Sequence, residues 1–167
     1  MTLSTHMIVG TAVASLFPSN PALGFGVAFL SHFVLDTIPH WDYAIVMKNG
    51  NSDIKDMDIE FNKNFIGSFI KISSDVALGL AVSLVLIFSL NLSSFSSLIA
   101  GCLGGMLPDF LQLVYMKFKH EPLLSLQKFH RWIQKDRGCK IKNPIIGIFT
   151  QVIVAFLAVW IIYLYMQ

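Results

Sequence analysis

Long apolar blocks separated by polar stretches dominate this chain. Residues 65–90, 95–118 and 144–165 are each long enough, as a helix, to cross a bilayer core of about 30 Å. Two earlier blocks, 3–17 and 22–38, are short for that thickness. We therefore predict five membrane spans. The first two would form a short helical hairpin that neighbouring helices shield or that a locally thinner bilayer accommodates.

Two polar stretches, 41–62 and 119–143, are the predicted long loops. The first is rich in Asp, Asn and Lys, which indicates a solvated segment. The second is basic, and residues 123–134 within it predict a short interfacial helix. A tight turn is predicted at Asn91-Leu92-Ser93-Ser94. The expected fold is thus an all-α polytopic membrane helix bundle, with residues 1–167 forming one membrane-embedded domain.

Composition agrees with this pattern and excludes an ordinary soluble domain. The chain is 54% hydrophobic and only 13% charged, with a mean hydropathy of +0.65, whereas a soluble domain carries about 25% charged residues. Because no basic segment precedes the first apolar block, we predict a retained helix rather than a cleaved signal peptide. Cys102 and Cys139 match no metal-binding spacing, and we expect reduced thiols.

The positive charges predict the orientation in the membrane. Of the twelve Lys and Arg residues, only Lys71 lies in the interior of a predicted span, Lys117 lies at the end of the fourth span beside the second loop, and the two short turns carry none. The other eleven lie in or beside the two long loops. The positive-inside rule therefore places the N-terminus and both loops in the cytoplasm. We expect an integral protein of a prokaryotic inner or plasma membrane.

The strongest chemical signal is the stretch from Ser31 to Asp42. His32 and Asp36 are four residues apart, so they share one face of the second helix. Pro39 disfavours helix at the residue before it, so the chain turns there and presents His40 and Asp42 near the same end. Imidazole and carboxylate groups at this spacing suit a divalent metal. The ordinary alternative is a helix end whose polar groups cap carbonyls or pair with a lysine.

Other ionisable residues fall toward the same side of the predicted bundle. His6 begins the first span, and Asp75 and Asp109 lie roughly 14–15 Å from the cytoplasmic ends of the third and fourth spans. Each also has an ordinary explanation. Asp75 could pair with Lys71, Asp109 could be solvated by backbone at a proline break, and His6 could be an interfacial histidine without function.

Taken together, these groups predict a metal site. Burying three carboxylates costs several kcal/mol unless something neutralises them, and Lys71 can neutralise only one. One or two divalent cations would neutralise the rest. Mixed imidazole and carboxylate ligands favour Zn²⁺, or Mn²⁺ or Fe²⁺, and such a site supports hydrolysis through an acidified water. The predicted metal ligands are His6, His32, Asp36, His40, Asp75 and Asp109.

Three motifs resemble the YdjM-like inner-membrane proteins, a family described as metal-dependent hydrolases. They are His6 before Gly10, Ser-His-x-x-x-Asp-x-x-Pro-His-x-Asp from Ser31, and Gly-x-Leu-Pro-Asp ending at Asp109. That family often has a further Asp and His after its Pro-Asp element, where this chain has Phe110-Leu111-Gln112. The departure puts a full second metal in doubt.

The His-x-x-x-Asp…His pattern of His32, Asp36 and His40 is also similar to a helix of zinc-dependent phospholipase C and the related zinc nucleases. Together the two resemblances imply a phosphoester substrate, with a lipid headgroup as the accessible form. In that reaction Asp42 would act as base or orienting carboxylate. His130, with Arg131, would protonate the leaving group or hold its phosphate.

We therefore expect a metal-dependent hydrolase that acts on a phospholipid or another phosphorylated amphiphile from the cytoplasmic face. Its partners would be membrane lipids and a small-molecule or lipid phosphoester, with no nucleic acid. The alternative is a non-enzymatic membrane protein that uses the His/Asp cluster to bind or pass a metal or proton, or simply to fold. A scaffold whose basic loops bind a partner is less favoured, because their charge density is ordinary for cytoplasmic loops.

Overall fold

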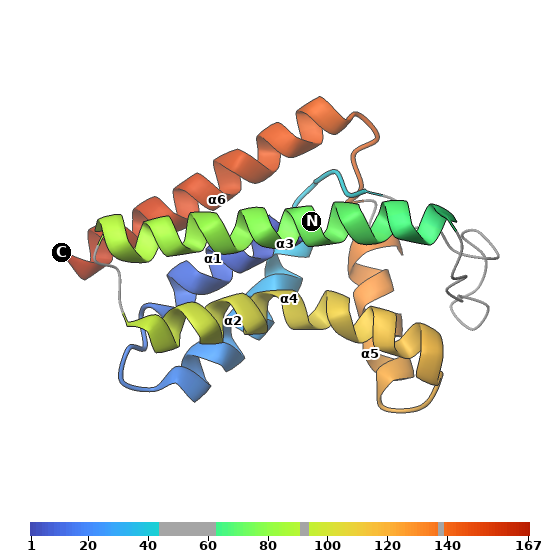
Figure 1. Ribbon diagram of the computed structural model, residues 1–167, viewed down its shortest axis with the longest axis horizontal. Helices are drawn as coiled ribbons and strands as arrows, with labels where there is room; N and C mark the ends of the chain where they lie inside the picture. The colour runs from blue at the N-terminus through green and yellow to red at the C-terminus, as the bar shows by residue number, and fades with distance from the viewer. Residues whose placement is uncertain (44–62, 91–93, 137–138) are drawn as a thin grey trace.

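Helices form most of the structure, a computed structural model that describes residues 1–43, 63–90, 94–136 and 139–167 (Figure 1). Within these residues there is no strand, so the predicted all-α bundle is confirmed. Most of the first predicted loop (44–62) and residues 91–93 of the predicted turn lie outside the described part. The elements are α1 (Leu3–Ala14), α2 (Pro21–Asp36), α3 (Lys63–Leu90), α4 (Phe95–Phe118), α5 (Leu123–Arg131), a π-helical turn (Trp132–Asp136) and α6 (Pro144–Met166).

Proline and asparagine set two of the helix starts. Pro21 and Pro144 begin α2 and α6, where a missing N–H costs nothing. The side chain of Asn20 accepts a hydrogen bond from the Leu23 N–H over 3.1 Å, and Asn143 caps α6 in the same way. The five apolar blocks and the short basic stretch therefore become helices close to their predicted bounds.

Small residues on α4 allow α1 to approach closely. A Cβ atom added at Gly101 would clash with the backbone of Thr11, and one added at Gly105 would clash with the carbonyl of His6. Glycine stripes of this kind let membrane helices pack backbone to backbone. The same contact places His6 of α1 directly against the middle of α4.

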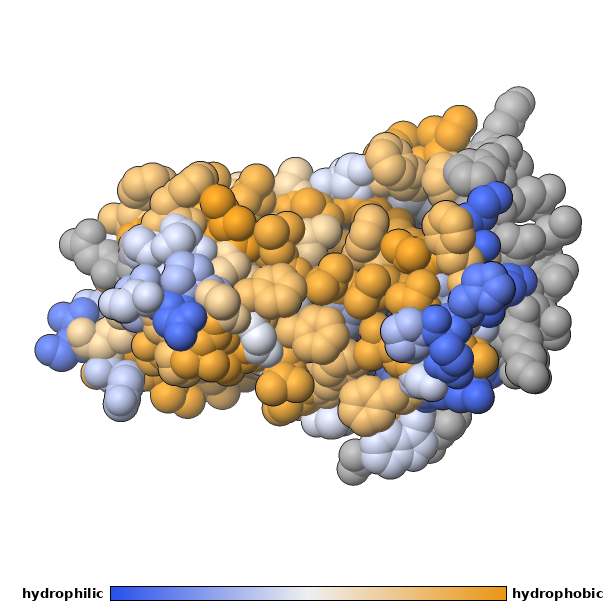
Figure 2. All heavy atoms as spheres, turned by 90° about the horizontal axis from the view of Figure 1, so that it is seen from below, coloured by the Kyte–Doolittle hydropathy of each residue, from blue (hydrophilic) through white to orange (hydrophobic). Residues whose placement is uncertain are grey.

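Three helices are long and apolar enough to cross a membrane, namely α3, α4 and α6, whereas α1 and α2 are apolar but shorter. Figure 2 shows a broad apolar band with hydrophilic residues gathered at its two ends. Large exposed side chains such as Phe88 of α3 and Phe149 of α6 belong to the apolar surface. This surface is that of a membrane protein.

Candidate metal centre

Asp36 lies at the centre of a buried polar cluster at the end of α2. Its carboxylate oxygens lie 3.2 Å from His6 Nε2, 3.3 Å from His32 Nε2 and 2.9 Å from His130 Nε2. His40 Nε2 is 3.8 Å away. All five side chains are almost completely buried. Four of the five histidines of the chain thus turn the same ring nitrogen toward one carboxylate.

Separate elements deliver these side chains. His32 and Asp36 are one turn apart on α2, and the ring of His6 on α1 stacks on that of His32 with centroids 3.7 Å apart. His130 comes from the last turn of α5. His40 is held by backbone pairing with a distant segment, since its N–H donates to the Cys139 carbonyl over 2.9 Å and its carbonyl accepts from the Ile141 N–H. Pairing with this segment fixes the turn that follows Pro39.

Backbone hydrogen bonds determine which ring nitrogens carry lone pairs. His32 Nδ1 donates to the Gly105 carbonyl over 2.8 Å, and His40 Nδ1 donates to the Ile38 carbonyl over 2.7 Å. A carbonyl only accepts, so in each neutral ring the proton lies on Nδ1 and Nε2 carries a lone pair. Both lone pairs face the Asp36 carboxylate, which also only accepts. A cation between them resolves this conflict, and backbone partners of this kind orient metal-binding histidines.

Buried polar atoms without hydrogen-bond partners also indicate a cation in the cluster. His6 Nδ1, His6 Nε2 and His40 Nε2 are buried without a hydrogen-bond partner. Such groups are rare because an unpaired buried polar atom costs about 1–3 kcal/mol. Burial also lowers the pKa of His40 to about 4, with the nearby amino terminus adding to the effect, so its ring is neutral at pH 7. A neutral imidazole is the form that binds a metal.

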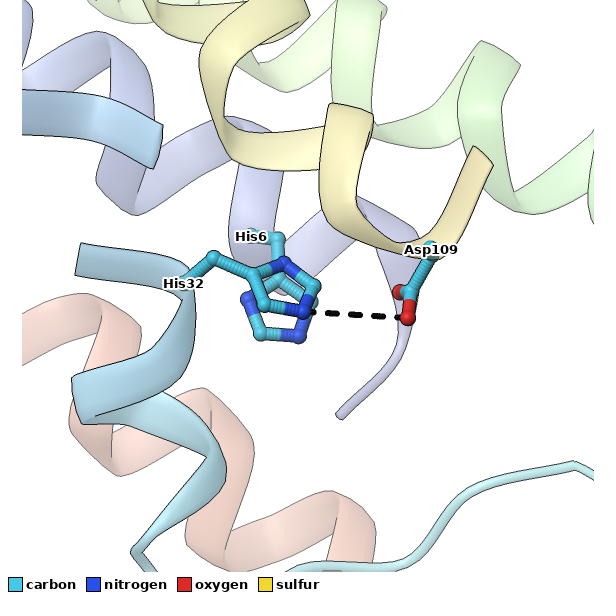
Figure 3. Close-up of side chains that lie close together, drawn as sticks. All are labelled: His6, His32 and Asp109. Atoms are coloured by element: carbon cyan, nitrogen blue, oxygen red, sulfur yellow. Dashed lines mark ion pairs between the residues drawn. The ribbon is translucent and has the colours of Figure 1, made fainter. Parts of the chain in front are cut away.

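The distances suit tetrahedral coordination. Two sets of donor atoms lie within 4.8 Å of one another, His6 with His32 and Asp109, and His32 with Asp36 and His130. Figure 3 shows the first set, in which His32 Nε2 lies 3.7 Å from Asp109 Oδ1. Two ligands of a tetrahedral zinc, each about 2.0–2.1 Å from the ion, lie roughly 3.3 Å apart. The described residues therefore contain buried His/Asp groups at metal-binding distance, with His32 common to both.

Of the six predicted ligands, five meet in this cluster and Asp75 does not. Asp75 Oδ2 instead accepts hydrogen bonds from the Leu3 N–H over 2.6 Å and from the Tyr43 hydroxyl over 3.2 Å. Among the described residues it forms no ion pair with Lys71, the alternative that the sequence also allowed. Asp75 therefore holds the start of α1, and through it the position of His6, rather than facing the cluster.

The two predicted catalytic residues are placed differently. His130 lies inside the cluster, with Asp109 Oδ1 3.5 Å from its Nε2, which is the position of a ligand rather than of an exposed proton donor. Asp42 lies outside it, 3.6 Å from Lys140 Nζ, and borders a cavity that also reaches Asp109. Burial raises the pKa of the Asp42 carboxyl.

Two partners of Asp36 were not predicted from the sequence. The side-chain amide of Gln134 donates to Asp36 Oδ2 over 2.7 Å. The signal that could have found it is its spacing of four residues after His130, which keeps both on one side of the helix end. The amino nitrogen of Met1 lies 2.6 Å from Asp36 Oδ1. Both groups donate hydrogen to a carboxylate that otherwise faces only ring nitrogens.

No family model, curated protein or solved structure matches this chain.

Proposed function

We propose that this protein is a membrane-bound, metal-dependent hydrolase that cleaves a phosphoester in a phospholipid or another phosphorylated amphiphile. The observation that carries the proposal is the convergence of four imidazole Nε2 atoms on Asp36, with too few protons between them to satisfy one another. The asymmetry of Lys and Arg supports the proposal that this end of the bundle faces the cytoplasm.

The ligand types favour Zn²⁺, with Mn²⁺ or Fe²⁺ as alternatives, because imidazole and carboxylate together suit these ions better than Ca²⁺ or Mg²⁺. His32, Asp36 and His130 would hold one ion. Because His32 offers a single lone pair, at Nε2, His6 and Asp109 would complete the coordination of that same ion or hold a second ion without His32. When bound, the metal lowers the pKa of a water molecule and offsets the charge of phosphoryl oxygens.

The remaining residues would bind and orient the reactants. In the proposed hydrolysis the water oxygen bonds to phosphorus, the ester phosphorus–oxygen bond breaks, and the departing alcohol oxygen receives a proton. Asp42, at the border of the cavity, would hold the proton taken from water or orient a ligand. Gln134 would fix the orientation of Asp36 through its 2.7 Å hydrogen bond. His130 would serve as a ligand, which replaces the role in leaving-group protonation that the sequence suggested.

Metal content tests the proposal directly. The protein would be purified in detergent without chelator, and bound metals would be measured by mass spectrometry for wild type, His32→Ala and Asp36→Ala. His120→Ala is the matched control, because His120 is exposed in the connection after α4. We expect stoichiometric transition metal in wild type and in the control, and its loss in the other two variants. A metal-free wild type would overturn the proposal.

A second candidate is a non-enzymatic protein in which the cluster carries a metal or proton, or is purely structural. It is favoured by the hydrogen bonds that Asp36 already receives from Gln134 and Met1, since these stabilise the carboxylate without a metal. A screen of phospholipids and generic phosphoesters separates the candidates. Metal binding without hydrolysis of any of them would favour the carrier.

A further inference from the structure

A cavity of about 320 Å³ lies beside the metal centre, between α3 and α4. One end is polar, and Asp109 belongs both to this end and to the ligand cluster. Gln134, which is hydrogen-bonded to Asp36, lines it as well. Further polar side chains in the cavity wall are those of Asp42, Tyr43, Gln112 and Lys140. A molecule in the cavity would therefore contact the metal centre directly.

Most of the remaining cavity wall is apolar. Ile72 and Val76 line it from α3, and Phe110 and Leu113 line it from α4. Both helices are long and apolar enough to cross a membrane. Phe110 is half exposed on the outer surface of α4, so the apolar wall continues onto the surface that faces lipid. The cavity thus joins a polar, metal-binding end to the hydrocarbon region of the bilayer.

The charges at the polar end depend on the metal. Without a metal, the three carboxylates of Asp36, Asp42 and Asp109 outnumber the two ammonium groups of Lys140 and the Met1 amino terminus, so a phosphate is disfavoured at this end. One or two divalent cations at the cluster reverse the local sign. Phosphate binding at this end should therefore require the metal, whereas binding of a hydrocarbon chain alone should not.

We infer that this cavity is the substrate site and that it takes a single-chain phosphorylated lipid sideways from the bilayer. The phosphate lies at the end formed by Asp109, Gln134 and Lys140, and the hydrocarbon chain lies between α3 and α4. This inference rests on the proposed function, because the metal centre supplies the positive charge. It adds the route of access and the side chains that select for a lipid.

Binding of lysophosphatidic acid, followed by native mass spectrometry of the detergent-solubilised protein, tests the inference. Val76→Trp fills the apolar wall, and Val85→Trp is its control, because Val85 lies on the same helix with its side chain exposed and lines neither this cavity nor the larger one between α3 and α6. We expect Val76→Trp to weaken binding about tenfold or more, since the indole takes up the space in which the hydrocarbon chain would lie. The control should bind as wild type does.

Three further measurements distinguish the possible results of this experiment. Inorganic phosphate should bind weakly and with the same affinity to both metal-loaded Trp variants, because it needs only the polar end. Lys140→Met, at a half-exposed side chain that does not threaten folding, should weaken lipid binding up to about fivefold. Metal content reports whether Val76→Trp has folded. If it has lost metal, Leu113→Trp on the opposite wall replaces it.

The results separate the inference from the proposed function. Equal lipid binding by Val76→Trp and Val85→Trp, or no binding by metal-loaded wild type, would overturn the inference while leaving metal-dependent hydrolysis intact. Selective loss of binding in Val76→Trp, with no cleavage of bound lysophosphatidic acid or of any phosphoester in the screen described above, would support the cavity as a lipid site and refute the hydrolase.

Discussion

α1 and α6 lie side by side in the bundle but use their residues in opposite ways. α1 has twelve residues and buries ten of them, including His6. α6 has twenty-three residues, of which only Gly147, Gln151 and Ile162 are buried. The helix that is too short to cross a bilayer is the one enclosed by protein, and it carries a site residue. The long helix presents apolar side chains outward. Enclosure by its neighbours explains how a short apolar helix is accommodated.

The contact between α1 and α4 should be the most sensitive point of this arrangement. Gly105→Ala places a methyl group against the His6 carbonyl, and backbone cannot move aside without shifting α1. We expect a loss of about 1–3 kcal/mol in the free energy of unfolding, together with loss of metal. Thermal unfolding in detergent measures the first, and metal analysis the second.

Gly67→Ala in α3 is the matched control, because nothing lies within 4 Å of the added Cβ. It should be neutral or stabilising by up to about 1 kcal/mol, as expected for alanine in place of glycine in a helix. Equal effects of the two substitutions would show that α1 does not pack against α4 as described.

Removal of the metal should cause the next largest loss in the free energy of unfolding. The loss should arise in the enclosed helices that carry the proposed ligands. A ligand that binds only the folded state at a hundred times its Kd stabilises it by about 2.7 kcal/mol. Chelation should therefore lower the unfolding temperature of wild type. It should leave that of Asp36→Ala unchanged, because this variant has lost the central carboxylate. A shift of equal size in both would mean that the chelated metal binds elsewhere.

Gln151 is the buried polar side chain through which α6 supports the site. Its Oε1 accepts from the Thr2 N–H over 2.7 Å, and its Nε2 donates to the Trp41 carbonyl over 2.7 Å. Gln151→Leu leaves both backbone groups unpaired, which should cost about 1–3 kcal/mol. Because Thr2 precedes the first turn of α1, metal affinity should also fall, and titration with Zn²⁺ would measure it. Destabilisation with unchanged affinity would show that α6 supports the fold without influencing the site.

Much of this arrangement was accessible from the sequence, because local signals determine it. Proline and asparagine mark the helix starts, and the four-residue spacing of His32 and Asp36 requires them to share a face. Asp75 was misjudged for a physical reason. The number of residues along a helix gives the depth of a side chain in the bundle but not the direction in which it points. The Asp75 side chain points to the start of α1. Gln134 was missed because a neutral amide is not a typical metal ligand, although its spacing of four residues from His130 places both side chains on one side of the helix end.

The outward face of α6 should be the least sensitive region. Phe149 is 64% exposed and lines neither described cavity. Phe149→Leu exchanges one apolar side chain for another against detergent or lipid, so the free energy of unfolding should change by no more than about 0.5 kcal/mol, and metal content should stay at the wild-type level. Measuring the thermal unfolding of Phe149→Leu and Gln151→Leu together compares an outward position with a buried position on the same helix. A loss at Phe149 as large as that at Gln151 would mean that this face packs against protein, and that α6 is enclosed as α1 is.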